Sequence, residues 1–175
     1  MFRRLLGRAA PAQPDTSAWW REANALAGKP DAERIAALRA QIADASKAPD
    51  VAELQEEMID GLERLLSLAQ QTVLPVIATQ HRVIGNELCH FIVPVSLIEQ
   101  VDASGKLFAT AERLVFAAGT VRQWPWHAIQ ALTRVERDVV IDLRGRPAAA
   151  RLRTNTYGDA LLLVALAERL RVNRS

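Results

Sequence analysis

Through residues 15–75, hydrophobic side chains recur every three or four positions, which is the spacing of one face of an α-helix. The pattern predicts helices over 17–27, 30–45 and 50–69. Gly28 suits the end of the first of these helices. Because only a short link joins the second and third helices, we expect these two to fold back as an antiparallel hairpin.

The third of these helices has its own start, stop and polar face. Asp50 followed by Glu53 is a capping-box pattern, and Pro75 is expected to end or kink the helix. The polar face is acidic and consists of Glu53, Glu56, Glu57, Asp60 and Glu63. Such a charge run is typical of a solvated face, and the alternative is a docking surface.

From about residue 86 the pattern changes to short runs rich in β-formers, separated by turn residues. These runs are 88–98, 106–110, 113–116, 128–135, 138–143 and 149–154. The segment 144–147 contains Gly and Pro and predicts a hairpin turn between the last two runs. A helix capped by Thr156 follows, with a broad apolar surface up to Leu170.

The chain is therefore expected to be an α+β protein. It has 175 residues, enough for one ordinary domain or for a small domain with an extension. We expect a flexible basic N-terminus over 1–14, a helical region over 15–75 and a β domain over 80–172. About six or seven antiparallel strands in a strongly bent sheet, its open end plugged by the C-terminal helix, would satisfy the second half of the pattern.

Charged residues are distributed unevenly along the chain. The formal net charge is +2, which does not indicate a nucleic-acid-binding protein. Residues 29–79 carry nine acidic against five basic side chains, whereas residues 80–175 carry nine acidic against thirteen basic side chains. Opposite charge in the two halves predicts two structural units that attract each other or serve separate partners.

Arginines are concentrated in segment 134–153. Arg151 and Arg153 are expected to share one strand face, and Arg144 and Arg146 lie in the adjoining turn. Three partners suit this surface: anionic lipid, an acidic protein, or the acidic helices of the same chain. The alternative is an ordinary solvated surface. Nucleic acid is disfavoured as a partner because no aromatic residues alternate with these arginines.

The first thirteen residues are basic and partly apolar. Phe2, Leu5 and Leu6 lie at helical spacing among three arginines. The run is too short for a secretory signal peptide, and no stretch of the chain approaches the ~20 apolar residues of a transmembrane helix. The segment is interpreted either as a frayed terminus or as a weak interfacial membrane anchor.

Metal or thiol chemistry would have to use the three His and the one Cys. These residues are His81, Cys89, His90 and His127. They lack the close spacing of zinc motifs. Cys89 and His90 are adjacent on an expected strand and should point to opposite faces, which disfavours joint binding of one metal ion. A single Cys also excludes an internal disulfide, which favours a reducing, cytoplasmic compartment. No metal and no cofactor are predicted.

One part of the β-rich half resembles a known family. The segments Gly105–Thr110, Arg113–Phe116 and Pro125–Trp126, followed by Ile129, resemble GRAM and bacterial pleckstrin-homology-like domains over about residues 85–172. The resemblance implies a seven-stranded barrel-like sandwich capped by a helix, used for binding or scaffolding rather than catalysis.

Some members of that family bind phosphoinositides through several basic residues in and around the first strand–strand loop. The corresponding loop here, 100–105, contains no basic residue, and only Lys106 and the more distant Arg113 supply cations. The sequence therefore does not favour a specific phosphoinositide site.

The function predicted from sequence is a non-enzymatic protein-interaction or scaffolding module that binds a partner protein or its own copies. The first alternative is a peripheral adaptor for anionic membranes that uses the basic N-terminus and the arginine hairpin. The second is a metal- or thiol-dependent enzyme. Because Trp19 and Trp20 are adjacent, a narrow helical stripe cannot bury both, so one is free for the seam between the units or for a partner. The candidate binding residues are Arg144, Arg146, Arg151, Arg153, Lys106, Trp19 and Trp20.

Overall fold

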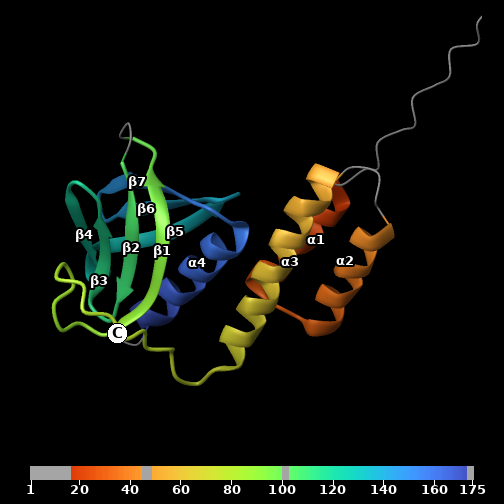
Figure 1. Ribbon diagram of the computed structural model, residues 1–175, viewed down its shortest axis with the longest axis horizontal. Coiled ribbons are helices and arrows are strands. Elements are labelled where there is room, and N and C mark those ends of the chain that lie inside the picture. The colour runs from red at the N-terminus through yellow and green to blue at the C-terminus, as the bar shows by residue number, and fades with distance from the viewer. Residues whose placement is uncertain (1–16, 45–48, 100–102, 173–175) are drawn as a thin grey trace, which may run out of the picture.

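The computed structural model describes residues 17–44, 49–99 and 103–172. In these residues it contains four α-helices and one antiparallel sheet of seven strands (Figure 1). The expected α+β class, with a helix after the last strand, is confirmed. No helix in the described part of the chain has the length and apolar character needed to cross a bilayer.

The helical unit consists of α1 (Ser17–Gly28), α2 (Ala32–Asp44) and α3 (Pro49–Gln70). All three pack around one cluster, so the expected hairpin of α2 and α3 is completed by α1. The buried residues of the cluster that these helices supply are Trp19, Ala23, Leu26, Ile35, Leu38, Ile42, Met58, Ile59 and Leu62. Helix α3 begins at Pro49 rather than at an Asp50 cap, because proline suits the first helical position, where no N–H is needed.

The β unit is a bent meander in which β1 and β7 pair and join the two halves. The strand order is β4-β3-β2-β1-β7-β6-β5, and every pairing is antiparallel. The strands are β1 (Cys89–Leu97), β2 (Ser104–Thr110), β3 (Arg113–Ala117), β4 (Val121–Pro125), β5 (Ile129–Val135), β6 (Asp138–Leu143) and β7 (Arg146–Thr154). The runs identified in the sequence did not include β4, because Trp124 alone of its five residues is buried.

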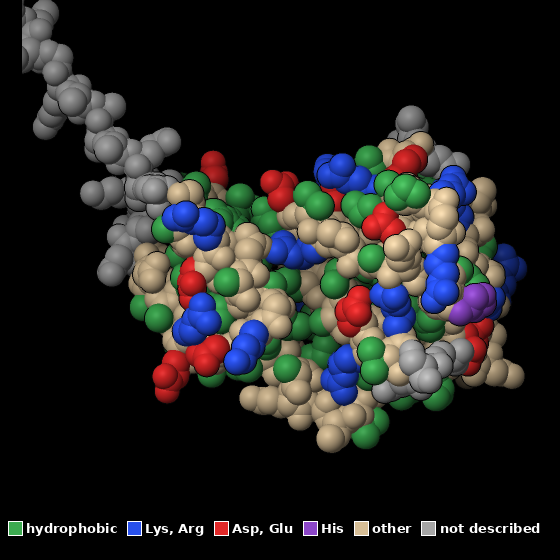
Figure 2. All heavy atoms as spheres, turned by 180° about the vertical axis from the view of Figure 1, so that it is seen from behind, with side chains coloured by type: hydrophobic (Ala, Val, Ile, Leu, Met, Phe, Trp, Pro, Cys, Tyr) green, Lys and Arg blue, Asp and Glu red, His purple; other side chains and the backbone are tan. Residues whose placement is uncertain are grey.

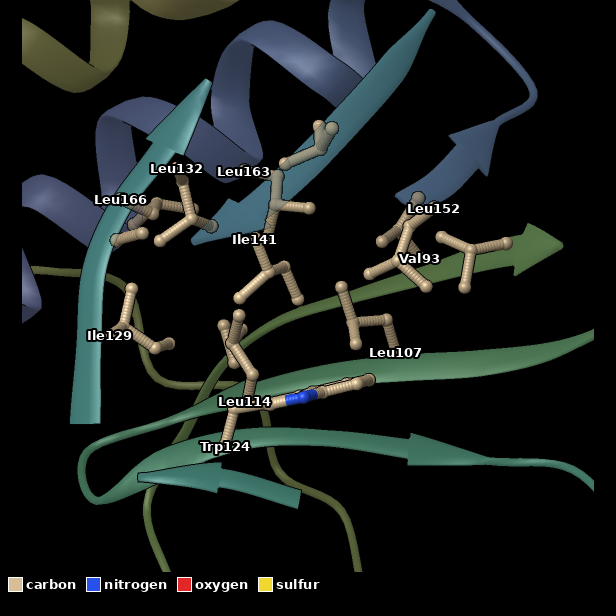
Figure 3. Packing of buried hydrophobic residues seen from close by; sticks show 14 of the residues in the cluster. Val93, Leu107, Leu114, Trp124, Ile129, Leu132, Ile141, Leu152, Leu163 and Leu166 are labelled. Atoms are coloured by element: carbon tan, nitrogen blue, oxygen red, sulfur yellow. The ribbon is translucent and has the colours of Figure 1, made fainter. Parts of the chain in front are cut away.

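Helix α4 (Tyr157–Val172) closes the sheet. The Thr156 hydroxyl accepts the Asp159 N–H at 3.0 Å, as the capping pattern predicts. Leucines on the inner side of α4 meet the inward-facing residues of the strands, and Figure 3 shows Leu163 and Leu166 pointing into this core. Burial of aliphatic and aromatic side chains between helix and sheet is the main stabilising contribution here.

The chain between α3 and β1 folds back onto the outside of the sheet. Ile77 forms an isolated antiparallel bridge with Cys89. Ile84 is buried against Phe108 and Val115 on the outer face of β2 and β3. This segment therefore covers one half of the outer face of the sheet and leaves the half around β7 open to solvent.

The helical unit packs against α4, which lies between it and the sheet (Figure 1). Gly61 of α3 meets Gly158 of α4 so closely that a Cβ built on Gly61 would lie 2.5 Å from the Gly158 Cα. Leu161 of α4 is buried in the cluster of the helical unit. Helix α4 is therefore apolar on two sides, which explains the broad apolar surface seen in its sequence.

Candidate binding surfaces

Strand β7 presents two arginines to solvent on its outer face. Burial alternates along the strand, so that Ala150, Leu152 and Thr154 point inward while Arg151 and Arg153 point outward. The two arginine side chains are 44% and 60% exposed. The alternation of the sequence predicted this arrangement.

A buried carboxylate holds the two guanidinium groups in place. Asp138, on the neighbouring strand β6, is only 3% exposed and lies between Arg151 and Arg153. Its oxygens lie 2.6 Å from Arg151 Nη2 and 2.8 Å from Arg153 Nε. Burial by itself raises the pKa of Asp138, but hydrogen bonds and charge from Arg153 and Arg151 outweigh this effect and lower it below its usual value.

Residues of β1 and β2 continue this surface. In the sheet register Ser96 lies opposite both Arg153 and Ser104, and the two serine Oγ atoms are 2.9 Å apart. Lys106 is two residues from Ser104 along β2 and therefore points the same way. Ser96, Ser104, Lys106, Arg151 and Arg153 are called the outer cationic face from here on. The face has three cations; Asp138 lies between two of them, and the charge of Glu136 also acts on Arg153.

The hairpin turn carries the other two candidate arginines away from that face. Gly145 has a φ of 75°, which glycine adopts without strain, and Arg144 and Arg146 beside it are exposed. The Arg144 N–H donates to the Ala128 carbonyl at 3.0 Å. Arg144 thus lines a hollow of about 340 Å³ next to the C-terminal end of α4, together with His127.

Two more arginines of the same segment face the helical unit. Arg137 donates to Glu57 of α3, with its Nε 3.1 Å from Oε1, and its guanidinium lies 5.3 Å from the centre of the Tyr157 ring. Arg134 donates to Asn24 of α1 and to the Glu136 carbonyl. Arg137 therefore contacts the acidic helix of its own chain, as one of the three interpretations of the arginine segment expected.

The two tryptophans of α1 lie inside the protein or at the seam between its units. Trp19 is 6% exposed and its indole N–H donates to the Leu38 carbonyl at 3.1 Å. Trp20 is half-buried and its ring lies 5.3 Å from that of Tyr157, at the junction with α4. Neither side chain belongs to the outer cationic face.

The His and Cys residues have separate surroundings. Cys89 is 1% exposed; burial raises the pKa of its thiol, and a bond to the Phe91 carbonyl opposes this only in part. His90 Nδ1 lies 2.8 Å from the Pro75 carbonyl oxygen, and His81 packs on Phe108. Across residues 17–44, 49–99 and 103–172, no three His, Cys, Asp or Glu side chains are grouped to hold a metal ion.

Two sequence predictions fall outside the described residues. These are the basic N-terminal segment 1–13 and half of the first strand–strand loop, residues 100–102. The membrane-anchor interpretation of the N-terminal segment stays a prediction.

Comparison with known proteins gives only distant structural likeness. No protein-family model matches the chain, and no curated protein matches it. One similar solved structure is the ternary complex between human RhoA, its inhibitor and the DH/PH domain of human ARHGEF11. The identity is 12% and the TM-score is 0.39, over 90% of this chain and 54% of that chain. This chain thus spans about half the length of the solved chain.

The fold of the β unit is established by its own topology. Seven antiparallel strands followed by a helix that closes the sheet are what the resemblance to pleckstrin-homology-like domains implies. The narrower prediction of a GRAM or bacterial member is not supported by a family match.

Proposed function

We propose that the protein is a non-enzymatic interaction module that binds an acidic segment of a partner protein on its outer cationic face. The observation that carries this proposal is the arrangement around Asp138, which fixes Arg151 and Arg153 side by side on an open strand face. Lys106 adds a third cation on the same face.

Fixed guanidinium groups favour a partner with fixed carboxylates. An arginine fork binds a carboxylate through two parallel N–H donors. Because Asp138 already orders both arginine side chains, these side chains lose less conformational entropy when a partner binds them. The Ser96 and Ser104 hydroxyls, one of which donates to the other, leave one further O–H donor between Arg153 and Lys106. The single buried thiol of Cys89 is consistent with action in the reducing cytoplasm.

A second candidate function is attachment to an anionic membrane. Two exposed apolar side chains flank the cations: Val135, which is 47% exposed and pairs with Asp138, and Ile98, which is 43% exposed and donates its N–H to the Arg151 carbonyl. Apolar side chains beside cations suit a lipid surface. The ordered pair of arginines still favours the protein partner, because a lipid layer gains little from cations held in one geometry.

The experiment uses the full chain and two probes, a synthetic peptide of Glu and Ser and vesicles that contain phosphatidylserine. We expect saturable peptide binding that weakens as salt increases. Lys106→Glu should weaken it by about fivefold or more, because it reverses one charge of the face while the Asp138 pairs stay intact. Arg21→Glu is the matched control, because Arg21 is exposed on α1 and gives the same change in net charge.

Three results are informative. Loss of peptide binding in Lys106→Glu but not in Arg21→Glu supports the proposal. Binding to vesicles with no binding to the peptide would assign the face to membranes instead. Equal peptide binding by all three proteins would mean that the outer cationic face is an ordinary solvated surface.

A further inference from the structure

A groove lies where the helical unit meets the β unit. It has a volume of about 500 Å³, which is in the range of small-molecule sites. Figure 2 shows hydrophobic side chains in the hollow between the two units, with charged side chains around it. The apolar lining comes mainly from α3 and α4 and includes Leu65, Leu68, Leu161, Val164 and Ala165.

Both units contribute to the walls. The corner between α1 and α2 supplies Ala27 and Pro30, and β5 supplies Arg134, which donates to Asn24 of α1. The contact of Gly61 with Gly158 sets the close packing of α3 on α4 from which the groove follows. Neither unit alone would form this site.

Two guanidinium groups give the groove a positive rim. Arg134 is half-buried and donates to the Asn24 Oδ1 and to the Glu136 carbonyl; within the described part of the chain it has no carboxylate partner. Arg169 is held at the C-terminal end of α3, where it donates to the Leu68 and Gln71 carbonyls.

The acid on the same rim does not offset these cations. Glu168 lies 3.2 Å from Arg171, with which it forms its own ion pair. Among the described residues, Arg134 and Arg169 are therefore both balanced only by neutral oxygens, and Arg169 already donates to three carbonyls. A guanidinium group has five N–H donors. The bonds of Arg134 to Asn24 and Glu136 use two of these donors, so others remain for a ligand.

We propose that this groove binds a single-chain anionic amphiphile, such as a medium-chain fatty acid. The alkyl chain would cover the leucines of α3 and α4, and the carboxylate would accept hydrogen bonds from Arg134. Charge complementarity selects this occupant over the N-terminal segment of the same chain, because Arg3, Arg4 and Arg8 would be repelled by Arg134 and Arg169.

The test titrates the full-length protein with decanoate, decanol and decyltrimethylammonium and follows backbone amide NMR signals. The two ions stay below their micelle-forming concentrations, and decanol stays below its solubility limit. We expect saturable decanoate binding with shifts centred on Leu65, Leu161 and Ala165. Arg134→Gln should weaken decanoate binding about tenfold and leave decanol binding unchanged, because only the carboxylate uses the guanidinium group.

Two further variants separate the groove from general charge effects. Ala165→Trp fills the half-buried floor and should weaken both decanoate and decanol. Arg146→Gln removes an equal charge from the exposed hairpin turn and should change neither. If Ala165→Trp does not fold, Arg134→Gln and Arg146→Gln still decide the question.

The proposal is wrong if decanoate does not bind saturably to the folded protein, or if decyltrimethylammonium binds as tightly. It is also wrong if the shifts lie outside the groove, or if Arg146→Gln weakens decanoate as much as Arg134→Gln does. The outer cationic face is not part of the groove, so none of these results bears on the proposed protein partner.

Discussion

Glu57 illustrates how single side chains join the two units. Its carboxylate accepts hydrogen bonds from Arg137 and from the backbone N–H of Tyr157 at the start of α4. The N-terminus of a helix favours a negative charge, so one residue of α3 pairs with an arginine and also stabilises α4. The Glu57 side chain is 19% exposed, whereas Asp60 on the solvent side of the same helix is 68% exposed.

Asp138→Asn should make stability less dependent on pH. The lowered pKa of Asp138 means that its contribution is present above about pH 5 and is lost as the pH falls through the folded-state pKa, below the unfolded value of about 3.9. At pH 7 the variant should be less stable by about 1–2 kcal/mol, because it loses its charged hydrogen bonds to Arg151 and Arg153. The loss is not larger because both arginine side chains are well exposed to solvent.

Urea unfolding at pH 7 and at pH 3 measures this difference, with Glu99→Gln as an exposed control that should unfold like wild type. If the free energies of unfolding of wild type and Asp138→Asn differ as much at pH 3 as at pH 7, the lowered pKa of Asp138 is contradicted.

Cys89 should react slowly with a thiol reagent while the protein is folded. It is buried, and burial keeps the thiol protonated at neutral pH by raising its pKa. Reaction with a disulfide reagent should be slower by on the order of a hundredfold in buffer than in denaturant, because it requires local opening. Fast labelling of the folded protein would instead support the thiol-enzyme alternative.

At the scale of the elements, the packing of α3 on α4 decides how the units are joined. Two glycines face each other at this crossing, so the helix backbones approach more closely than side chains would allow. The Arg169 guanidinium also donates to the Leu68 and Gln71 carbonyls at the C-terminal end of α3, where the Gln71 N–H is the other donor to Leu68. Steric fit and capping thus hold the same pair of helices.

Gly61→Ala tests this crossing. In an exposed helix the change would stabilise the protein by about 1 kcal/mol, because alanine has the higher helix propensity. Here the new Cβ would meet the Gly158 Cα at 2.5 Å, so α3 and α4 must separate. We expect a loss of about 1–3 kcal/mol in urea unfolding.

Gly28→Ala is the matched control for that variant. A Cβ at Gly28, the last residue of α1, would meet no atom within 4 Å, so stability should be unchanged or slightly higher. A stabilising effect of Gly61→Ala would show that the two helices are not tightly packed in solution.

At the scale of the whole molecule, each of the two large hydrophobic clusters contains residues from both units. Leu68 of α3 and Leu74 after it are buried in the core of the β unit. Leu161 of α4 is buried in the cluster of the helical unit. Helices and sheet therefore share their buried surface, and each would expose apolar side chains without the other.

We expect the protein to unfold as one cooperative unit. Native-state hydrogen exchange should give the most protected amides of α3 and of β1 the same free energy of opening, because loss of either unit uncovers the core of the other. Far-UV circular dichroism and tryptophan fluorescence should give coincident urea transitions. Amides of α3 that open well below those of β1 would show that the helical unit is an independent appendage.

The sequence by itself determined the elements. Hydrophobic spacing of about three and a half residues located the helices, and alternation located Arg151 and Arg153 on one strand face, because side-chain direction follows directly from backbone geometry. The turn at Gly145 and the Thr156 cap are equally local. Strand β4 was not predicted because its sequence is short and mostly exposed, so hydrophobic and polar residues do not alternate clearly along it.

Only the tertiary structure decided which charges meet. Asp138 lies on a different strand from Arg151 and Arg153, and Glu57 is eighty residues from Arg137, so no local pattern links them. The groove beside Arg134 likewise depends on how two units pack. Periodicity fixes the direction in which a side chain points, but long-range packing fixes which residues it contacts. The proposed partner and the proposed ligand both depend on these long-range contacts.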